Sequence, residues 1–317
     1  YVTGNPRFDM LRPELRSFYD EPVKKLRNQY GRIILINTSF PMANHFQDME
    51  ILNKQFIRYP LFRTPGFLKG FIDSQHRAFE SFKKILPLVA AEYPNHTIIV
   101  RPHPSENRDT WREQTTCLSN AAVEADGNVI EWILAAEVLL HSSCTTGIEA
   151  FYLDVPAIGW RNGGDDCFEQ PLPNALSLQA YTIEEMMEYI KSAIDKHNSN
   201  SMRKNVNACQ TAAANISGME GKLACDRILD VLDLLDCRRV KRPLISKMDR
   251  WARDKAADIR KFIETRGREN HAYTNQKFTR LSIFEMIETH KRLQATTGRF
   301  HDVTISPVCD SCFLLRK

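Results

Sequence analysis

Two short polar segments of this 317-residue chain carry side chains that suit phosphate chemistry. They are Arg101-Pro102-His103-Pro104 and His141-Ser142-Ser143-Cys144-Thr145-Thr146-Gly147. Two prolines hold the first segment extended, so Arg101 and His103 are presented rigidly. A guanidinium and an imidazole beside a hydroxyl-rich turn suit a diphosphate or a phosphodiester. The two segments together therefore predict an anion-binding site.

The second segment reads as a strand that enters a hydroxyl-rich turn and then a helix. Such a turn presents backbone N–H groups, hydroxyl donors and the positive end of a helix to one point. The alternative is a run of helix N-caps, although one hydroxyl suffices for a cap and four are present. Glu149, in the first turn of that helix, is either a charge that favours the helix dipole or an acceptor for ribose or sugar hydroxyls.

A third polar segment, Asn37-Thr38-Ser39, follows the apolar run 33–36. In open α/β sheets, ligands bind outside the carboxyl ends of the strands, where all three segments are expected to lie. The predicted nucleotide-sugar and phosphate site consists of Asn37, Thr38, Ser39, Arg101, His103, Ser142, Ser143, Thr145, Thr146, Gly147 and Glu149.

The elements that must position these residues alternate between helices and strands. Apolar runs predict strands at 33–36, 97–100, 138–140 and 156–160. Periodic apolar residues predict helices at 13–30, 67–93, 130–136, 148–153, from 182 onward and at 219–235. This alternation predicts an α/β, Rossmann-like parallel sheet with helices on both faces. We expect a connector at 1–12, the Rossmann-like domain at 13–236, and a mainly helical tail at 237–317 with a short β segment near its end.

Charge is distributed unevenly along the chain. Residues 237–317 hold 19 Lys and Arg against 9 Asp and Glu, whereas the first 236 residues hold 24 against 30. Within this basic tail, one face of a predicted helix is apolar: Leu244, Met248, Trp251, Ile259 and Phe262. Such a helix packs against another domain or attaches to an anionic membrane surface. The tail lacks the aromatic stacking motifs of nucleic-acid-binding modules, so we predict no nucleic acid partner.

Other features predict no metal site and an intracellular location. The eight cysteines are scattered, which is typical of reduced thiols, and Cys309-x-x-Cys312 lacks the second ligand pair of a zinc site. Asp165-Asp166 follows Asn-Gly-Gly and reads as a turn rather than as a magnesium pair. Without a membrane-spanning run or a secretory segment, we expect a cytoplasmic protein. If the basic helix attaches to a membrane rather than to another domain, the protein is peripheral at the inner membrane.

Three motifs resemble the bacterial surface carbohydrate biosynthesis proteins. They are Val2-Thr3-Gly4-Asn5-Pro6-Arg7-Phe8-Asp9, the segment from Arg101 to Glu106, and the segment from Trp132 to Ala150. That family is similar to GT-B glycosyltransferases, including bacterial sialyltransferases and transferases of Kdo, 3-deoxy-manno-octulosonic acid. In these enzymes a C-terminal Rossmann-like domain binds a CMP-activated sugar acid through a His-Pro motif and a serine pair. By resemblance, these correspond to His103-Pro104 and Ser142-Ser143.

The resemblance implies a catalytic role for His103, which would hold the CMP phosphate and protonate or neutralise the leaving group. Ser142 and Ser143 would bind the phosphate or the sugar carboxylate. It further implies a lipid-linked or polysaccharide acceptor, with no cofactor and no metal, because GT-B sites usually work without one.

A GT-B enzyme also has an N-terminal acceptor domain, which these residues do not match. The chain thus resembles the donor-binding half. The alternatives are a sugar-nucleotide epimerase and a non-catalytic subunit that binds sugar nucleotides.

Overall fold

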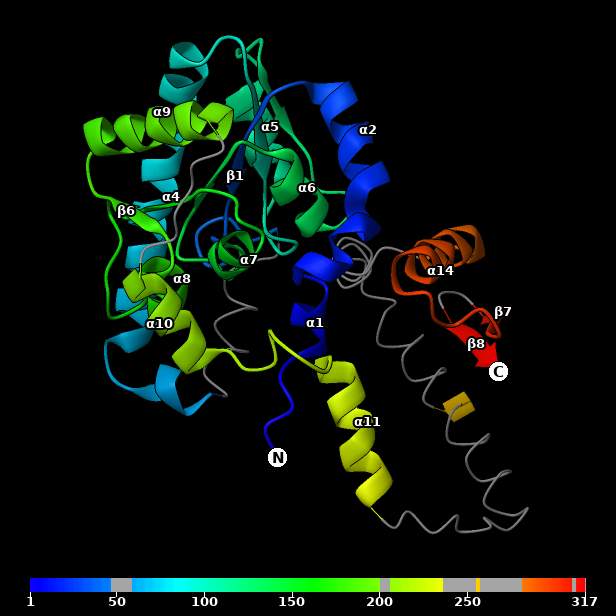
Figure 1. Ribbon diagram of the computed structural model, residues 1–317. Helices are drawn as coiled ribbons and strands as arrows, with labels where there is room; N and C mark the ends of the chain where they lie inside the picture. The colour runs from blue at the N-terminus through cyan, green and yellow to red at the C-terminus, as the bar shows by residue number, and fades with distance from the viewer. Residues whose placement is uncertain (47–58, 200–205, 236–254, 257–280, 310–311, 317) are drawn as a thin grey trace.

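A six-stranded parallel sheet forms the centre of the molecule (Figure 1). This computed structural model describes residues 1–46, 59–199, 206–235, 255–256, 281–309 and 312–316. The strands are β1 (Ile33–Asn37), β2 (Thr97–Arg101), β3 (Ala121–Val123), β4 (Val138–His141), β5 (Ala157–Trp160) and β6 (Leu178–Ala180). Their order is β3-β2-β1-β4-β5-β6, which reverses between β1 and β4. This is the Rossmann-like order, and the predicted fold class is confirmed.

Helices cover both faces of the sheet. On one face lie α4 (Phe67–Glu92), α5 (Arg108–Thr115) and α9 (Ile183–Ser199); on the other lie η1 (Pro13–Tyr19), α2 (Asp20–Tyr30), α6 (Val129–Ala135) and α7 (Thr146–Tyr152). Along β1, Ile34 and Ile36 pack into the first layer, whereas Ile33 and Leu35 pack into the second. Burial on both faces explains why the central strands are continuous apolar runs.

Other elements complete the described chain. They are α1 (Pro6–Asp9), η2 (Pro60–Arg63), α8 (Pro171–Ala175), α10 (Val206–Asn215), α11 (Ala224–Leu234), α14 (Ile283–Thr297), β7 (Thr304–Cys309) and β8 (Cys312–Arg316). Both β3 and β6 are three-residue strands at the sheet edges, and the sequence analysis had missed them. A strand of that length carries too little periodicity to be distinguished from a loop.

Residues 1–12 pack closely against the segment that leads into α11. Gly4 has φ +86°, and a Cβ there would lie 2.7 Å from the Ser217 carbonyl oxygen. The buried Asp9 carboxylate accepts the N–H of Ala224 at 2.7 Å and that of Cys225 at 2.9 Å, which caps α11. Leu11 is fully buried in the core beneath η1. The segment is therefore part of the folded domain.

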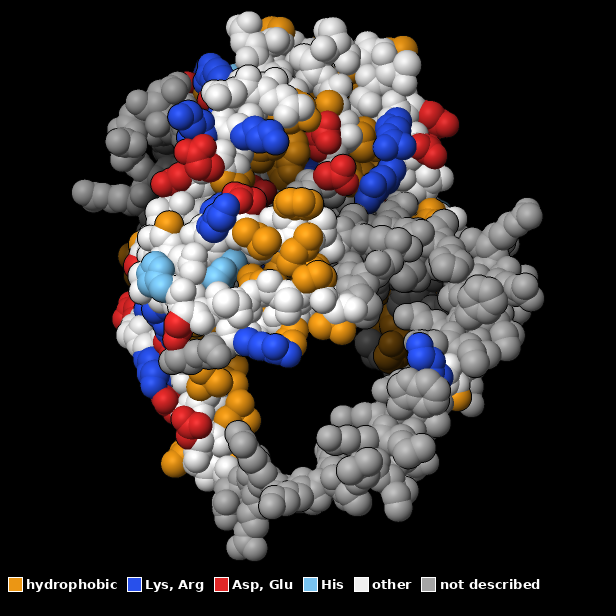
Figure 2. All heavy atoms as spheres, turned by 90° about the vertical axis from the view of Figure 1, so that its right-hand side faces the viewer, with side chains coloured by type: hydrophobic (Ala, Val, Ile, Leu, Met, Phe, Trp, Pro, Cys, Tyr) orange, Lys and Arg blue, Asp and Glu red, His pale blue; other side chains and the backbone are white. Residues whose placement is uncertain are grey.

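The C-terminal tail also contacts this domain. In α14, Arg292 lies over the Phe18 ring at 4.6 Å, and just beyond the helix Arg299 makes a bidentate ion pair with Asp226. β7 and β8 form an antiparallel hairpin where the sequence predicted a β segment. Hydrophobic side chains gather at mid-height on the face carrying α14 and the hairpin (Figure 2). The predicted apolar stripe from Leu244 to Phe262 lies outside the described residues, so its membrane role stays a prediction.

No helix in the described ranges combines the length and the apolar character needed to cross a membrane.

A buried carboxylate joins the amino ends of the three central strands. Glu137, just before β4, accepts two hydrogen bonds from Arg32, at 2.8 and 3.0 Å, and lies 3.2 Å from Nε2 of His96. Burial acts to raise the pKa of Glu137, but the hydrogen bonds from Arg32 and His96 lower it below its ordinary value. The carboxylate is therefore ionised in the folded protein at neutral pH.

We expect Glu137→Gln to lower the free energy of unfolding by about 1 to 2 kcal/mol, because one oxygen that accepts a charged donor is lost. This range allows for solvent screening, since the Arg32 side chain is 45% exposed. Urea denaturation at pH 7 measures the change. Glu80→Gln, which removes an exposed pair with Lys83 on α4, should alter stability little. Equal effects of the two substitutions would contradict this role of Glu137.

Candidate functional site

The three polar segments meet at the point where the strand order reverses. The last residue of β1, Asn37, is in register with Arg101 of β2 on one side and with His141 of β4 on the other. Beyond the strands, the backbone N–H of Ser39 donates to the Ser142 hydroxyl at 3.1 Å. Ligands of open α/β sheets bind at this switch point. The structure thus brings the predicted segments to one edge of the sheet.

Glu106 links two of these segments, although the sequence analysis gave it no role. Its side chain is fully buried. One carboxylate oxygen accepts the Thr38 hydroxyl at 2.9 Å and the N–H groups of Phe40 and His103 at 3.1 and 3.0 Å. The other accepts the Trp111 indole N–H at 2.9 Å. Burial raises the pKa of Glu106, against the effect of these hydrogen bonds.

The His103 ring is held in one tautomer by the next turn of chain. Its Nδ1 accepts the backbone N–H of Ser105 at 3.2 Å and lies 2.6 Å from the Ser105 hydroxyl. A nitrogen that accepts an N–H carries no proton, so the proton of the neutral ring lies on Nε2. This is the nitrogen that could donate to a phosphate oxygen. The side chain is half-buried, and its backbone is fixed by Glu106.

The turn after β4 presents several hydrogen-bond donors. The Ser142 hydroxyl accepts from Ser39, and no described residue accepts its proton. The N–H groups of Thr145 and Thr146 likewise donate to no acceptor in the described chain. Thr146 Oγ1 and Asn37 Oδ1 are buried polar atoms without a hydrogen-bond partner among the described residues. Buried polar groups are normally paired, so this edge is equipped to bind a polar ligand.

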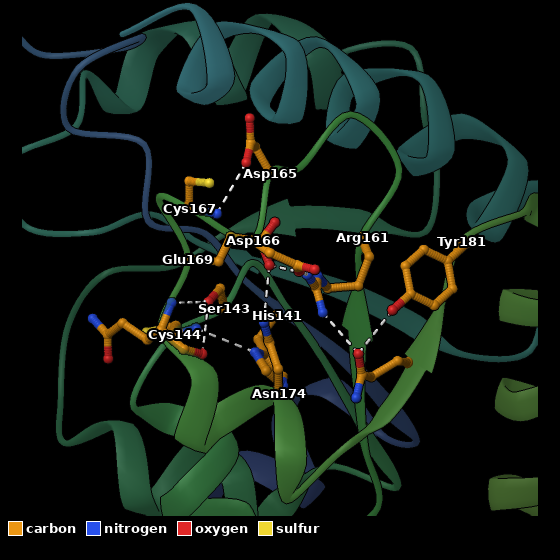
Figure 3. A network of polar contacts seen from close by, with 12 residues as sticks. His141, Ser143, Cys144, Arg161, Asp165, Asp166, Cys167, Glu169, Asn174 and Tyr181 are labelled. Atoms are coloured by element: carbon orange, nitrogen blue, oxygen red, sulfur yellow. Dashed lines mark hydrogen bonds and ion pairs between the residues drawn. The ribbon is translucent and has the colours of Figure 1, made fainter. Parts of the chain in front are cut away.

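Ser143, the second member of the serine pair, uses its hydroxyl for hydrogen bonds within the protein. It has φ +48°, which is a left-handed conformation that is rare for a residue other than glycine. Its hydroxyl donates to the Gln170 carbonyl at 3.1 Å and accepts the Gln170 N–H at 2.6 Å. Ser143 therefore ties the turn to the loop 161–170, as Figure 3 shows.

That loop contains the acidic pair Asp165-Asp166, and both residues have structural partners. Asp165 accepts the N–H of Cys167 at 2.9 Å, as an aspartate in a turn does, and Asp166 pairs with the buried Arg161. Arg161 also meets Glu169 at 2.5 Å (Figure 3). The predicted turn is confirmed. The guanidinium of Arg161 is paired with two carboxylates of the same loop.

Arg101 lies at the predicted edge but points its guanidinium into the protein. It donates to the carbonyls of Asp126, at 2.7 Å, and Gly127, at 3.2 Å, and lies over the Trp132 ring at 5.1 Å. Burial lowers the pKa of Arg101 to about 10, so the group stays charged at neutral pH. In this arrangement, Arg101 supports the loop after β3 while its charge remains close to the strand ends.

Glu149 is almost completely buried and pairs with Arg7 of α1. Burial raises the pKa of Glu149, and the nearby Arg7 acts in the opposite direction. Its second oxygen, Oε2, has no hydrogen-bond partner among the described residues. The residue thus joins residues 1–12 to α7 and keeps one acceptor unused.

The His141 side chain holds the turn after β4 in place. Cys144 donates its N–H to Nδ1 at 3.3 Å, and Nε2 lies 2.8 Å from the Ser177 hydroxyl, whose proton goes to the Pro173 carbonyl. Nε2 therefore carries the ring proton. Gly147 packs against this ring so closely that a Cβ would lie 2.7 Å from Nε2. A glycine is therefore needed at position 147 for packing against His141.

Comparison with known proteins gives a few distant structural likenesses. No protein family model matches the sequence, and no curated protein has a similar sequence. The chain is similar to UDP-GlcNAc 2-epimerase from Methanocaldococcus jannaschii, with 15% identity over 74% of this chain and 55% of that chain, and a TM-score of 0.43. The chain thus spans about half the length of that epimerase.

Two other similar structures are a transferase and a polymerase. One is KpsC from Thermosulfurimonas dismutans, a beta Kdo 2,7 transferase, with 14% identity over 72% of this chain and 66% of that chain, and a TM-score of 0.29. The other is the wall teichoic acid polymerase TagF, with 12% identity, coverages of 74% and 53%, and a TM-score of 0.30. Values this low carry no conclusion about activity.

The pH dependence of stability tests the role of His141. Burial lowers the pKa of this ring to about 4, so below pH 6.5 the unfolded chain binds a proton that the folded protein does not. Between pH 7 and pH 5 this difference costs about 2 kcal/mol of unfolding free energy. Urea titrations of His141→Gln should show a correspondingly smaller loss over this interval. The control His76→Gln, at an exposed histidine, should behave as wild type. Equal slopes for all three proteins would contradict this assignment.

Proposed function

We propose that this chain is the nucleotide-sugar-binding half of a glycosyltransferase of the GT-B type. The observation that carries the proposal is the contact of Ser39 with Ser142 at the switch point between β1 and β4, with the His103 segment following the neighbouring strand β2 at the same edge. The edge combines an imidazole N–H, a hydroxyl and two unused backbone N–H groups, a set of donors that suits a phosphate.

In the proposed transfer, an acceptor hydroxyl oxygen bonds to the anomeric carbon and gives up its proton to a base on the acceptor side, while the bond between that carbon and the phosphate oxygen breaks and its electron pair stays on the phosphate oxygen. The Ser142 hydroxyl and the N–H groups of Thr145 and Thr146 would stabilise the charge that develops there. His103 would hold the departing phosphate oxygen by a hydrogen bond from its Nε2–H, and only the imidazolium form of the ring could transfer a proton to that oxygen and return to the neutral ring. The same groups could therefore bind the donor and assist its departure.

Other residues of the edge have supporting roles in this proposal. Asn37 and Glu149 each keep a buried oxygen without a partner, and these oxygens could accept hydroxyl groups of ribose or sugar. Thr38, Ser39 and Arg101 would shape the site, because their groups bind neighbouring segments. Ser143 would act through the loop that it holds rather than through its hydroxyl.

The finer part of the proposal is that the donor is a CMP-linked sugar acid and the acceptor a lipid-linked or polysaccharide glycan of the bacterial surface. It rests on the resemblance of His103-Pro104 and Ser142-Ser143 to the His-Pro motif and serine pair. Two described cations at this edge, Arg101 and Arg161, have protein partners. Arg108, whose charge acts on Arg101, keeps a buried Nε without a hydrogen-bond partner among the described residues. A sugar carboxylate would therefore be recognised by hydroxyl and N–H donors, with Arg108 as the nearby cation.

Calorimetry with CMP, CDP and UDP tests nucleotide binding. We expect CMP to bind more tightly than UDP, and His103→Ala to weaken binding by roughly 1.5 to 3 kcal/mol, because a charge-assisted contact with the phosphate is lost. Ser142→Ala should weaken binding for the same reason, by a smaller amount. His301→Ala, at an exposed histidine of the tail, serves as the control and should bind like wild type. A folded wild-type domain that binds none of the three nucleotides would refute the proposal.

Activity assays separate transfer from the alternatives. Incubation of the intact protein with a nucleotide sugar alone detects epimerisation or hydrolysis, whereas addition of an acceptor glycan detects transfer. Turnover to an epimer without acceptor would favour the epimerase, and binding without any turnover would favour a non-catalytic subunit.

A further inference from the structure

We propose that Glu106 is the positioning residue of this site, and that its carboxylate fixes His103 relative to the Ser142 turn. The inference rests on the proposed function, since it concerns the geometry in which the nucleotide phosphate is held. Glu106 itself is fully buried and acts through the residues that it binds.

The surroundings of Glu106 match a carboxylate and no other side chain. All five of its described partners are donors. Oε1 accepts from Thr38, Phe40 and His103, and Oε2 accepts from Trp111 at 2.9 Å and from the Asn44 amide at 3.4 Å. A glutamine would place an NH₂ group against two of these donors, and an aspartate would be too short to reach all of them.

The donors come from three separate parts of the chain. Thr38, Phe40 and Asn44 belong to the segment after β1, His103 to the segment after β2, and Trp111 to α5. Other hydrogen bonds also join the first two segments, including that from the Asn107 N–H to the Asn44 carbonyl at 2.7 Å and that from the Thr38 N–H to the Arg101 carbonyl at 3.1 Å. Among the described contacts, however, it is the Glu106 carboxylate that ties the backbone N–H of His103 itself to the segment after β1.

Ser39 extends this link to the Ser142 turn. Ser39 lies between Thr38 and Phe40, which both donate to Glu106, and its own N–H donates to Ser142 at 3.1 Å. His103 is bound to the same carboxylate oxygen. A shift of Glu106 would therefore move the two phosphate-binding groups relative to one another.

Glu137 shows what a buried glutamate does when it has only a structural role. It also joins neighbouring strands, but at their amino ends, on the edge of the sheet opposite the proposed site. Glu106→Gln and Glu137→Gln are therefore matched variants. Both lose one acceptor oxygen of a buried carboxylate, and only the first is connected to His103.

The experiment compares nucleotide binding by these two variants, using CMP in calorimetry below the unfolding temperature of each. Glu106→Gln should weaken binding by about tenfold or more, because small displacements of positioned groups are costly. Glu137→Gln should lose stability and bind within about twofold of wild type. In a double-mutant cycle, His103→Ala and Glu106→Gln should be less than additive, since Glu106 acts through His103.

A second measurement needs no ligand. The ring ¹⁵N resonances of His103 report which nitrogen carries the proton, and Glu106→Gln should disturb the Nε2-protonated form that Glu137→Gln leaves intact. If folded Glu106→Gln keeps both wild-type binding and the wild-type His103 resonances, the inference is overturned. If wild type binds no nucleotide, the proposed function fails, and the ring resonances still decide whether Glu106 positions His103.

Discussion

The arrangement of the candidate site depends on one buried carboxyl group, that of Glu106. A carboxylate in the protein interior is unfavourable unless donors replace the water it has lost, and Glu106 gathers such donors from three parts of the chain. The same requirement explains the polar residues around it. Thr38 lies where a hydroxyl can reach inward, and Trp111 turns its indole N–H toward the carboxylate while its ring fills the core. The site is held by this cluster more than by the turns themselves.

The sheet could be predicted from the sequence because the central strands are continuous apolar runs bounded by polar residues. The runs that became β1, β2, β4 and β5 were predicted as strands, and the three polar segments that follow β1, β2 and β4 lie at one edge as expected. The edge strands β3 and β6 could not be found, since three residues at the margin of a sheet need no distinctive pattern. The central strands can therefore be predicted from local sequence, whereas the edge strands are determined by packing against the rest of the sheet.

The roles of individual site residues were harder to predict. Arg101 could bind a phosphate, but its guanidinium donates to carbonyl groups of the loop after β3. No local sequence pattern shows which of these acceptors the side chain will bind. Glu106 would be assigned to the surface from sequence alone, since glutamate is seldom buried. The useful signal was that it follows Arg101-Pro-His-Pro within two residues. A carboxylate so near a rigid turn is well placed to bind its backbone N–H groups.

The packing of residues 1–12 has a consequence for where this domain can be cut. Asp9 supplies acceptors for the first N–H groups of α11, and Leu11 fills part of the core beneath η1. A protein shortened to begin at Pro13 would leave that helix end uncapped and a cavity in the interior, so it would be less stable and more easily digested by proteases. The close backbone approach of Gly4 to Gly218 adds a second contact between residues 1–12 and the segment that leads into α11. The segment 1–12 and helix α11 thus depend on each other, and the smallest stable fragment of this domain must contain both.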